Sequence, residues 1–135
     1  MKKLLLIPIL LLIFINLFSQ KDENLKVIVY YFHATHRCNT CMEIENKTKL
    51  VLFQDFKDEI INGIIKFKDF DYEDPENKKI VEKYFAYGST LLLVYPKDEI
   101  KNVDLTEMAF QYVINKPEKF KEILSQEIEK LIKSD

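Results

Sequence analysis

Residues 27–41 read VIVYYFHATHRCNTC, and this stretch decides the fold. Its first six residues are a continuous apolar run, rich in β-branched and aromatic side chains, which is typical of a strand covered on both faces. Apolar or small residues with helical spacing come next, at Cys41, Ile44, Thr48, Val51 and Leu52. The cysteine pair is therefore predicted to lie where a central strand leads into an amphipathic helix.

A second strand and a second helix are predicted downstream. Gly63 is expected to separate the first helix from a strand over residues 64–71. Asp74 followed by Pro75 is a helix-start signal, because an N-cap residue precedes proline at the first helical position. The helix that begins there is predicted to end at Gly88, and it carries an apolar stripe of Ile80, Val81, Tyr84 and Phe85.

The last part of the chain predicts a hairpin and two helices. Residues 90–95 predict a second buried strand, and a turn at 96–98 leads to a weaker antiparallel strand over 100–103. A short helix is predicted over 105–114, and a strongly amphipathic helix beyond Pro117. Seven aromatic side chains are expected to pack in the core or between helix and sheet: Phe53, Phe56, Phe67, Phe70, Tyr84, Phe85 and Tyr87.

The order of these elements predicts the fold class. It is β-α-β-α-β-β-α with an extra short helix before the last, which favours an α/β fold with a mixed four-stranded sheet flanked by helices on both faces. The motif Cys38-Asn39-Thr40-Cys41 heads the first helix. In these features the chain resembles the thioredoxin-like superfamily, and the resemblance covers most of residues 25–133. It implies one domain close to the minimal version of that fold.

The cysteine pair predicts redox chemistry. A sulfur at a helix amino terminus is stabilised as a thiolate by free N–H groups and the helix dipole, so Cys38 is the predicted nucleophile. Arg37 and His36 are expected to lower the pKa of Cys38 further, and Cys41, more buried, would resolve the mixed disulfide. The resemblance implies an enzyme, a thiol-disulfide oxidoreductase that acts on protein thiols or disulfides with an unidentified redox partner. No cofactor is expected, because the cysteine pair itself would be the redox-active disulfide.

The sequence departs from the family at two places. Thioredoxin-like proteins usually carry a cis-proline before the strand that faces the motif, and Ser89 stands there, so Ser89 and Thr90 are the expected substrate-groove residues. The family's buried acid in the first strand also has no counterpart, which leaves water, His36 or Glu45 to transfer protons. Glu45 is otherwise interpreted as a complement to the helix dipole.

Two other interpretations of the motif are open. His33, His36, Cys38 and Cys41 offer two imidazoles and two thiolates within nine residues, a donor set suited to zinc or cuprous ion. His33 has a simpler role available, as a residue that caps the strand or packs in the sheet. Alternatively, the protein is a non-catalytic interaction protein with a local disulfide, although so short a loop stabilises a fold weakly.

The amino terminus predicts export. Lys2 and Lys3 precede an apolar run over residues 4–18, which predicts a signal peptide at 1–19. The run is interrupted by Pro8 and is shorter than the about 20 residues of a membrane span, so cleavage is favoured over an anchor. The mature domain is expected in the periplasm or outside the cell, where disulfides persist. Membrane contact is expected only if the leader stays attached.

The composition and charge of the chain limit the kinds of partner that are expected. The chain has ten Phe, seven Tyr and 47% hydrophobic residues, which predicts a packed globule rather than a disordered chain. Its net charge is −2, with acidic and basic residues interspersed, and loss of Lys2 and Lys3 makes it −4. Nucleic acid is therefore not an expected partner. A monomer is expected.

Overall fold

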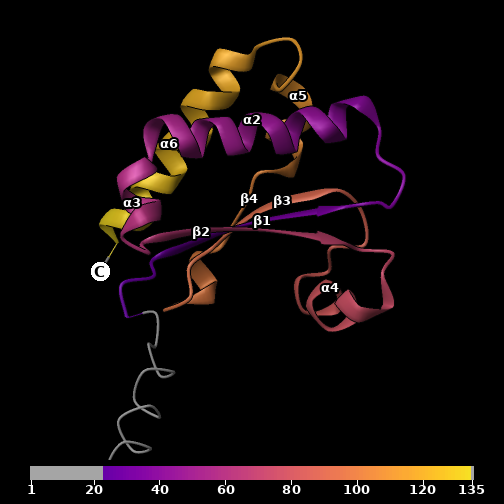
Figure 1. Cartoon of the computed structure of the whole chain (residues 1–135), viewed down its shortest axis with the longest axis horizontal. Helices are drawn as coiled ribbons and strands as arrows, with labels where there is room; N and C mark the ends of the chain where they lie inside the picture. Colours follow the sequence, from indigo (N-terminus) through magenta and orange to yellow (C-terminus); the bar gives the residue numbers. More distant parts are fainter. Residues whose placement is uncertain (1–22, 135) are drawn as a thin grey trace, which may run out of the picture.

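The computed structural model describes residues 23–134, which form one four-stranded sheet with helices on both faces (Figure 1). The predicted leader, 1–19, lies outside these residues. The elements follow in the order β1 (Val27–His33), α2 (Asn39–Asp55), α3 (Lys57–Ile61), β2 (Ile65–Asp71), η1 (Pro75–Asn77), α4 (Lys78–Tyr84), β3 (Thr90–Val94), η2 (Glu99–Lys101), β4 (Val103–Asp104), α5 (Thr106–Tyr112) and α6 (Pro117–Lys133). Within residues 23–134, no helix is both long enough and apolar enough to cross a membrane.

The sheet has the strand order β2-β1-β3-β4 and mixes parallel with antiparallel pairs. β1 runs parallel to β2, with Val27 opposite Ile65, and antiparallel to β3, with Tyr30 opposite Leu92. β4 adds an antiparallel edge to β3. The predicted α/β class and mixed sheet are confirmed, and the arrangement is compatible with a thioredoxin-like fold.

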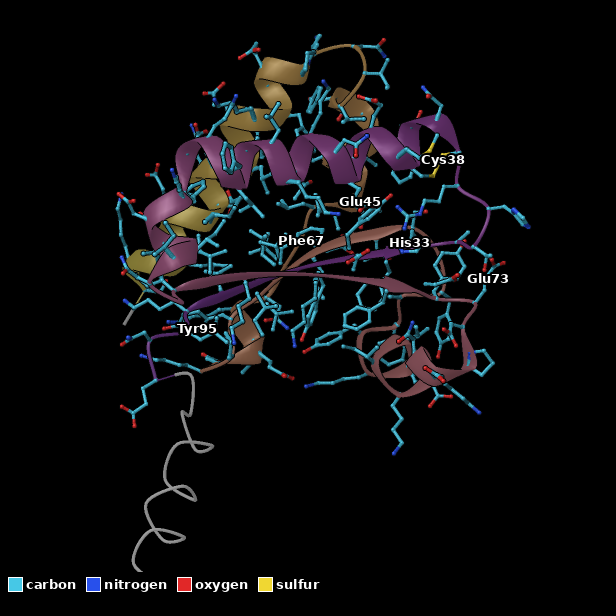
Figure 2. All side chains as sticks on the ribbon, viewed as in Figure 1. His33, Cys38, Glu45, Phe67, Glu73 and Tyr95 are labelled. Atoms are coloured by element: carbon cyan, nitrogen blue, oxygen red, sulfur yellow. A yellow bond between two sulfur atoms is a disulfide. The ribbon has the colours of Figure 1, made fainter. Side chains whose placement is uncertain are left out.

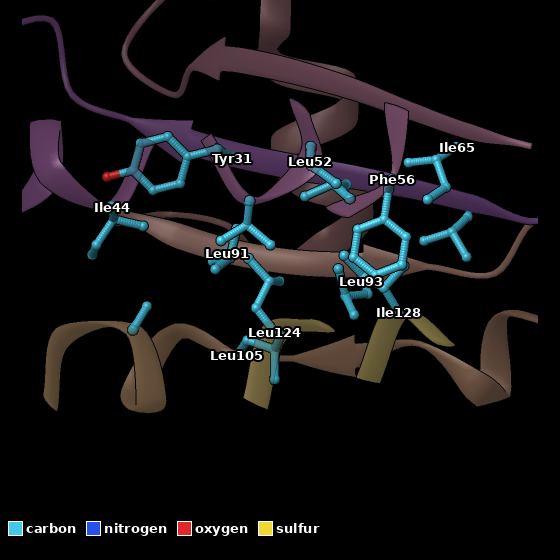
Figure 3. Packing of buried hydrophobic residues seen from close by; sticks show 14 of the residues in the cluster. Tyr31, Ile44, Leu52, Phe56, Ile65, Leu91, Leu93, Leu105, Leu124 and Ile128 are labelled. Carbon is cyan, nitrogen blue, oxygen red and sulfur yellow. The ribbon is translucent and has the colours of Figure 1, made fainter. Parts of the chain in front are cut away.

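The continuous apolar run of β1 is explained by two cores, one on each face of the sheet. Alternate side chains of a strand point to opposite faces, so Val29 and Tyr31 enter one core while Tyr30 and Phe32 enter the other. The larger core lies beneath α2, α5 and α6; Figure 3 shows Leu52 together with Leu91, Leu93, Leu124 and Ile128. The smaller core lies under α4 on the opposite face (Figure 1) and is built from aromatic contacts of Tyr30, Phe32, Phe70 and Tyr84.

Helix α4 ends at a different residue from the one predicted. Its C-cap is Phe85, in the left-handed conformation with φ of 53°, and Gly88 plays no part in the ending. The N–H of Ala86 bonds to the carbonyl of Val81, which closes the last turn and buries Ala86. The same turn directs Phe85 outward, where 80% of it is exposed, so its predicted place in the apolar stripe is wrong.

The expectation that seven aromatic residues pack is also wrong for Phe53 and Tyr87, which are exposed. Phe53 lines an open apolar groove with Ile60 and Ile61 of α3, and this five-residue helix is too short to cover it. Gly63 follows α3 with φ of 72°, a conformation suited to glycine, and begins the turn into β2 as predicted.

The predicted strand over residues 100–103 is largely replaced by a short helix. The Asp98 carboxylate accepts the N–H of Ile100 at 3.1 Å and so caps η2. The Asn102 side chain accepts the N–H of Tyr95 at 2.8 Å, which takes the place of a bond between strands. β4 therefore has two residues, Val103–Asp104.

Candidate redox site

Cys38 and Cys41 form a disulfide at the start of α2 (Figure 2), with their Cα atoms 5.0 Å apart. Cys38 is the N-cap of α2 and is exposed, whereas Cys41 is buried, with 9% of it accessible. The difference follows from helical geometry, because Cys41 lies one turn into the helix on the face that contains Ile44 and Thr48. A partner's sulfur can therefore approach Cys38 more readily than Cys41.

The backbone around Cys38 suits a sulfur that carries negative charge. Cys38 has extended φ and ψ of −72° and 159°, and its Sγ accepts the N–H of Cys41 at 3.0 Å. The first turn of α2 holds no acidic residue that would oppose the positive end of the helix dipole. In the reduced protein, a thiolate at this position would receive the same N–H and the same dipole.

Two residues from the sheet contact Cys41. The Tyr31 hydroxyl donates to the Cys41 carbonyl at 2.7 Å, and the Ser89 hydroxyl lies 3.6 Å from the Cys41 sulfur. Burial raises the pKa of Tyr31 to about 12, against a smaller opposing effect of the hydrogen bond with Ser89. Tyr31 was not among the residues expected at the site. Its alternation with Val27 and Val29 places it on the face beneath α2, which is the signal that could have found it.

The two predicted groove residues lie at the start of β3: Ser89 ends the loop before it, and Thr90 is its first residue. Ser89 is brought to Cys41, whereas the Thr90 hydroxyl donates to the carbonyl of Gly88 at 2.9 Å. Among residues 23–134 there is no cis peptide bond. Of these two residues, Ser89 contacts the cysteine pair, and Thr90 bonds to the loop that carries Ser89.

Arg37 makes contacts that the sequence did not predict. We expected its charge to act on Cys38, but its guanidinium forms an ion pair with Glu45 and lies 2.7 Å from His33 Nε2 through Nη2. Glu45 was interpreted as a complement to the helix dipole, yet it is 7% exposed and also accepts from Lys49 at 2.5 Å. Burial raises the pKa of Glu45, but the Lys49 hydrogen bond and the Arg37 charge outweigh it, so the pKa is lowered overall.

The contacts of His33 define its hydrogen-bonding state. A guanidinium can only donate, so His33 Nε2 accepts from Arg37, and Nδ1 then carries the hydrogen donated to the Ala34 carbonyl at 3.0 Å. His33 is 7% exposed, and Asp69 lies 3.9 Å from Nε2. His33 thus packs at the end of β1 as a hydrogen-bonded residue.

The loop that leads to Cys38 is tied to the loop after β2. Thr35 donates its hydroxyl to Asp71 at 2.7 Å and its N–H to Glu73 at 2.8 Å. The bond from Thr35, together with the N–H of Glu73, lowers the pKa of Asp71. His36 lies next to this tether and is exposed. The tether links the segment between β1 and the cysteine pair to the end of β2.

The alternative metal donor set, His33, His36, Cys38 and Cys41, is not gathered around one point. In the described part of the chain, no group of three or more His, Cys, Asp or Glu side chains is placed to hold a metal ion. Both sulfurs are joined in the disulfide, His33 is bonded to Arg37, and His36 is exposed. The geometry around Cys38 and Cys41 is that of a disulfide pair.

Comparisons with known proteins identify no family. The chain matches no model of a protein family and no curated protein. Among solved structures, it is similar to one entitled "Structure of a malarial protein", with 20% sequence identity over 64% of this chain and 93% of that chain and a TM-score of 0.43. The function of the site is therefore inferred from its own geometry.

Proposed function

We propose that this protein is an exported thiol-disulfide oxidoreductase that exchanges disulfides with protein thiols through Cys38 and Cys41. One observation carries the proposal: an exposed Cys38 caps a helix and is bonded to a buried Cys41 one turn later. Exposure makes one sulfur accessible, and the helix terminus stabilises its thiolate. The buried sulfur is left to complete the exchange.

The proposed reaction proceeds in two exchange steps. In the reducing direction, the Cys38 thiolate attacks a partner disulfide, so that one sulfur–sulfur bond forms, the partner's bond breaks, and the released thiolate takes a proton. The Cys41 thiolate then attacks Cys38, which releases the partner's second thiolate and forms the Cys38–Cys41 disulfide. The partner disulfide is reduced by two electrons and the cysteine pair is oxidised. The oxidising direction is the reverse, and a separate redox partner restores the starting form.

The surroundings of the pair suggest roles for other residues. Ser89 contacts the buried sulfur at 3.6 Å and can supply a hydrogen bond to Cys41 when the disulfide opens. His36 is exposed two residues before Cys38 and is available to exchange protons with solvent. Ser89 and Thr90 would form one wall of the site for an extended partner segment.

Equilibration with glutathione tests the proposal, with mass spectrometry to identify the bonds formed. A reduction potential of roughly −120 to −270 mV places the pair among exchange catalysts, whereas a value below about −300 mV indicates a structural disulfide. We expect Cys38→Ala to abolish exchange with a small disulfide substrate. Cys41→Ala should still react once and should accumulate a mixed disulfide at Cys38. Exchange at the wild-type rate by Cys38→Ala would overturn the assignment.

Export is a separate part of the proposal and rests on the leader sequence. Expression of the full chain in a Gram-negative host, followed by fractionation and amino-terminal sequencing, tests it. A periplasmic protein that begins near residue 20 supports cleavage. A membrane fraction that retains Met1 supports an anchor, and a cytoplasmic full-length protein contradicts export.

A further inference from the structure

A group of hydrogen-bonded side chains, two of them buried and one half-buried, lies near the cysteine pair and has no part in the exchange steps above. It consists of Glu45, Arg37 and His33, and we refer to it as the charge cluster. Figure 2 shows Glu45 and His33 between α2 and the sheet, with Cys38 at the start of α2. The cluster links β1, the loop before the motif and the second turn of α2.

The burial of Glu45 needs an explanation. A carboxylate is costly to bury unless charged partners surround it, and α2 has positions on its outer face where a glutamate would stay solvated. Glu43, two residues earlier, is such a position, because its side chain keeps 35% of its surface exposed and pairs with Lys47 at 3.7 Å. Glu45 instead faces the sheet and binds Arg37 and Lys49.

The location of Arg37 provides the explanation. Arg37 directly precedes Cys38, and a cation next to a thiolate stabilises it and so favours the reduced form of the pair. In the structure the guanidinium bonds to Glu45 through Nη1 and to His33 through Nη2. Glu45 supplies the compensating charge, and His33 accepts a second hydrogen bond from the same group.

We propose that Glu45 is a positioning residue that holds Arg37 in an ion pair, with His33 as the second acceptor, and thereby keeps the Cys38–Cys41 pair more reducing than the free Arg37 charge would allow. The inference rests on the proposed function, because it concerns the equilibrium of the same two sulfurs. It gives Arg37 a weaker effect on Cys38 than the one that the sequence suggested. Because the guanidinium is paired with Glu45, its positive charge does not act fully on the Cys38 sulfur.

The test is the equilibrium of the full chain with glutathione, measured for matched variants. Glu45→Gln keeps the shape of the side chain and removes the charge that compensates Arg37. We expect the reduced form of this variant to be favoured at least tenfold over wild type, a rise of about 30 mV in a two-electron potential. Glu43→Gln removes an equal charge from the same helix and should change the equilibrium less than twofold.

A double variant separates the role of Arg37 from a general field effect. If Glu45 acts by holding Arg37, Glu45→Gln should shift the equilibrium much less when it is added to Arg37→Gln than when it is made in the wild-type protein. A shift that persists in the double variant overturns the proposal, as does a shift equal to that of Glu43→Gln. A merely structural role would destabilise the oxidised and reduced proteins equally in urea, and the potential would then stay at the wild-type value.

Two further outcomes concern the folding of Glu45→Gln and the redox activity of the wild-type pair. If Glu45→Gln does not fold, the test rests on Arg37→Gln alone. This variant leaves the Glu45 charge partly uncompensated, so we expect it to disfavour the reduced form at least twofold. An unchanged equilibrium, or a shift toward the reduced form, overturns the proposal. If the wild-type pair does not equilibrate with glutathione at all, the proposed function fails and this inference with it. A wild-type pair that equilibrates while Glu45→Gln and Glu43→Gln match it overturns the inference alone.

Discussion

Replacement of Tyr31 by Phe should destabilise the protein at neutral pH and stabilise it at alkaline pH. Tyr31 is fully buried below α2 and donates a hydrogen bond to the Cys41 carbonyl at 2.7 Å. Tyr31→Phe keeps the ring and removes this bond, which costs about 1 kcal/mol at neutral pH. Near pH 7 we therefore expect the wild-type protein to be the more stable of the two.

The pKa of Tyr31 reverses this order at alkaline pH. Burial raises the pKa from 10.0 to about 12 in the folded state. A raised pKa means that the folded protein holds its proton longer than the unfolded chain, so the stabilisation is complete below pH 10 and is lost as the pH rises toward 12. For this shift the loss is about 1.4 kcal/mol at pH 11 and about 2.3 kcal/mol at pH 12. The variant has no hydroxyl to ionise, so the two stabilities should cross at about pH 10.7.

Urea unfolding of the oxidised protein between pH 7 and pH 12, read within minutes of mixing, measures the difference. Burial also raises the pKa of Tyr30, but Tyr30 is present in both proteins and its effect cancels in the comparison. Tyr87→Phe, at an exposed tyrosine, is the control and should follow the wild type throughout. A difference between wild type and Tyr31→Phe that stays constant across this range would refute the reasoning.

Two further substitutions should raise stability. Thr48 is fully buried, and its hydroxyl has no hydrogen-bond partner among the described residues. Thr48→Val removes this unpaired polar group, so it should raise the free energy of unfolding in urea by about 1 kcal/mol. A less stable Thr48→Val protein would show that the hydroxyl has a partner, and Thr48→Ser, which loses the methyl group, should be less stable than wild type. Phe85→Gly should raise the melting temperature by relieving the positive φ of an exposed residue, a net gain of about 1 kcal/mol after the entropy of glycine is subtracted. An unchanged or lower melting temperature would mean that Phe85 makes stabilising contacts despite its exposure.

The fold class and the order of elements could be predicted because both depend on local patterns. The buried run over 27–32 and the helical spacing after Cys41 are properties of single elements, and each survives in the structure as β1 and α2. Element ends were predicted less well. The closure at Phe85 and the Asp98 cap of η2 arise from individual hydrogen bonds that composition and periodicity do not specify.

The candidate site divides in the same way. Its two cysteines were found from their spacing and their place between a strand and a helix, which are features of neighbouring residues. The partners of those cysteines come from distant segments: Tyr31 from β1 and Ser89 from the loop before β3 meet at Cys41. Their approach depends on how α2 lies across the sheet, which no local pattern records.

The sequence by itself determined that a CxxC pair heads a helix after a buried strand, because strand and helix periodicities and the N-terminal position of Cys38 are written in consecutive residues. Only the tertiary structure decided the electrostatics around that pair. Arg37 is adjacent to Cys38 in the chain, yet in the folded protein its guanidinium binds Glu45 and His33. The physical reason is that the groups packed around a charged side chain decide how strongly its charge acts on a neighbour. Packing brings together residues that are separate in sequence.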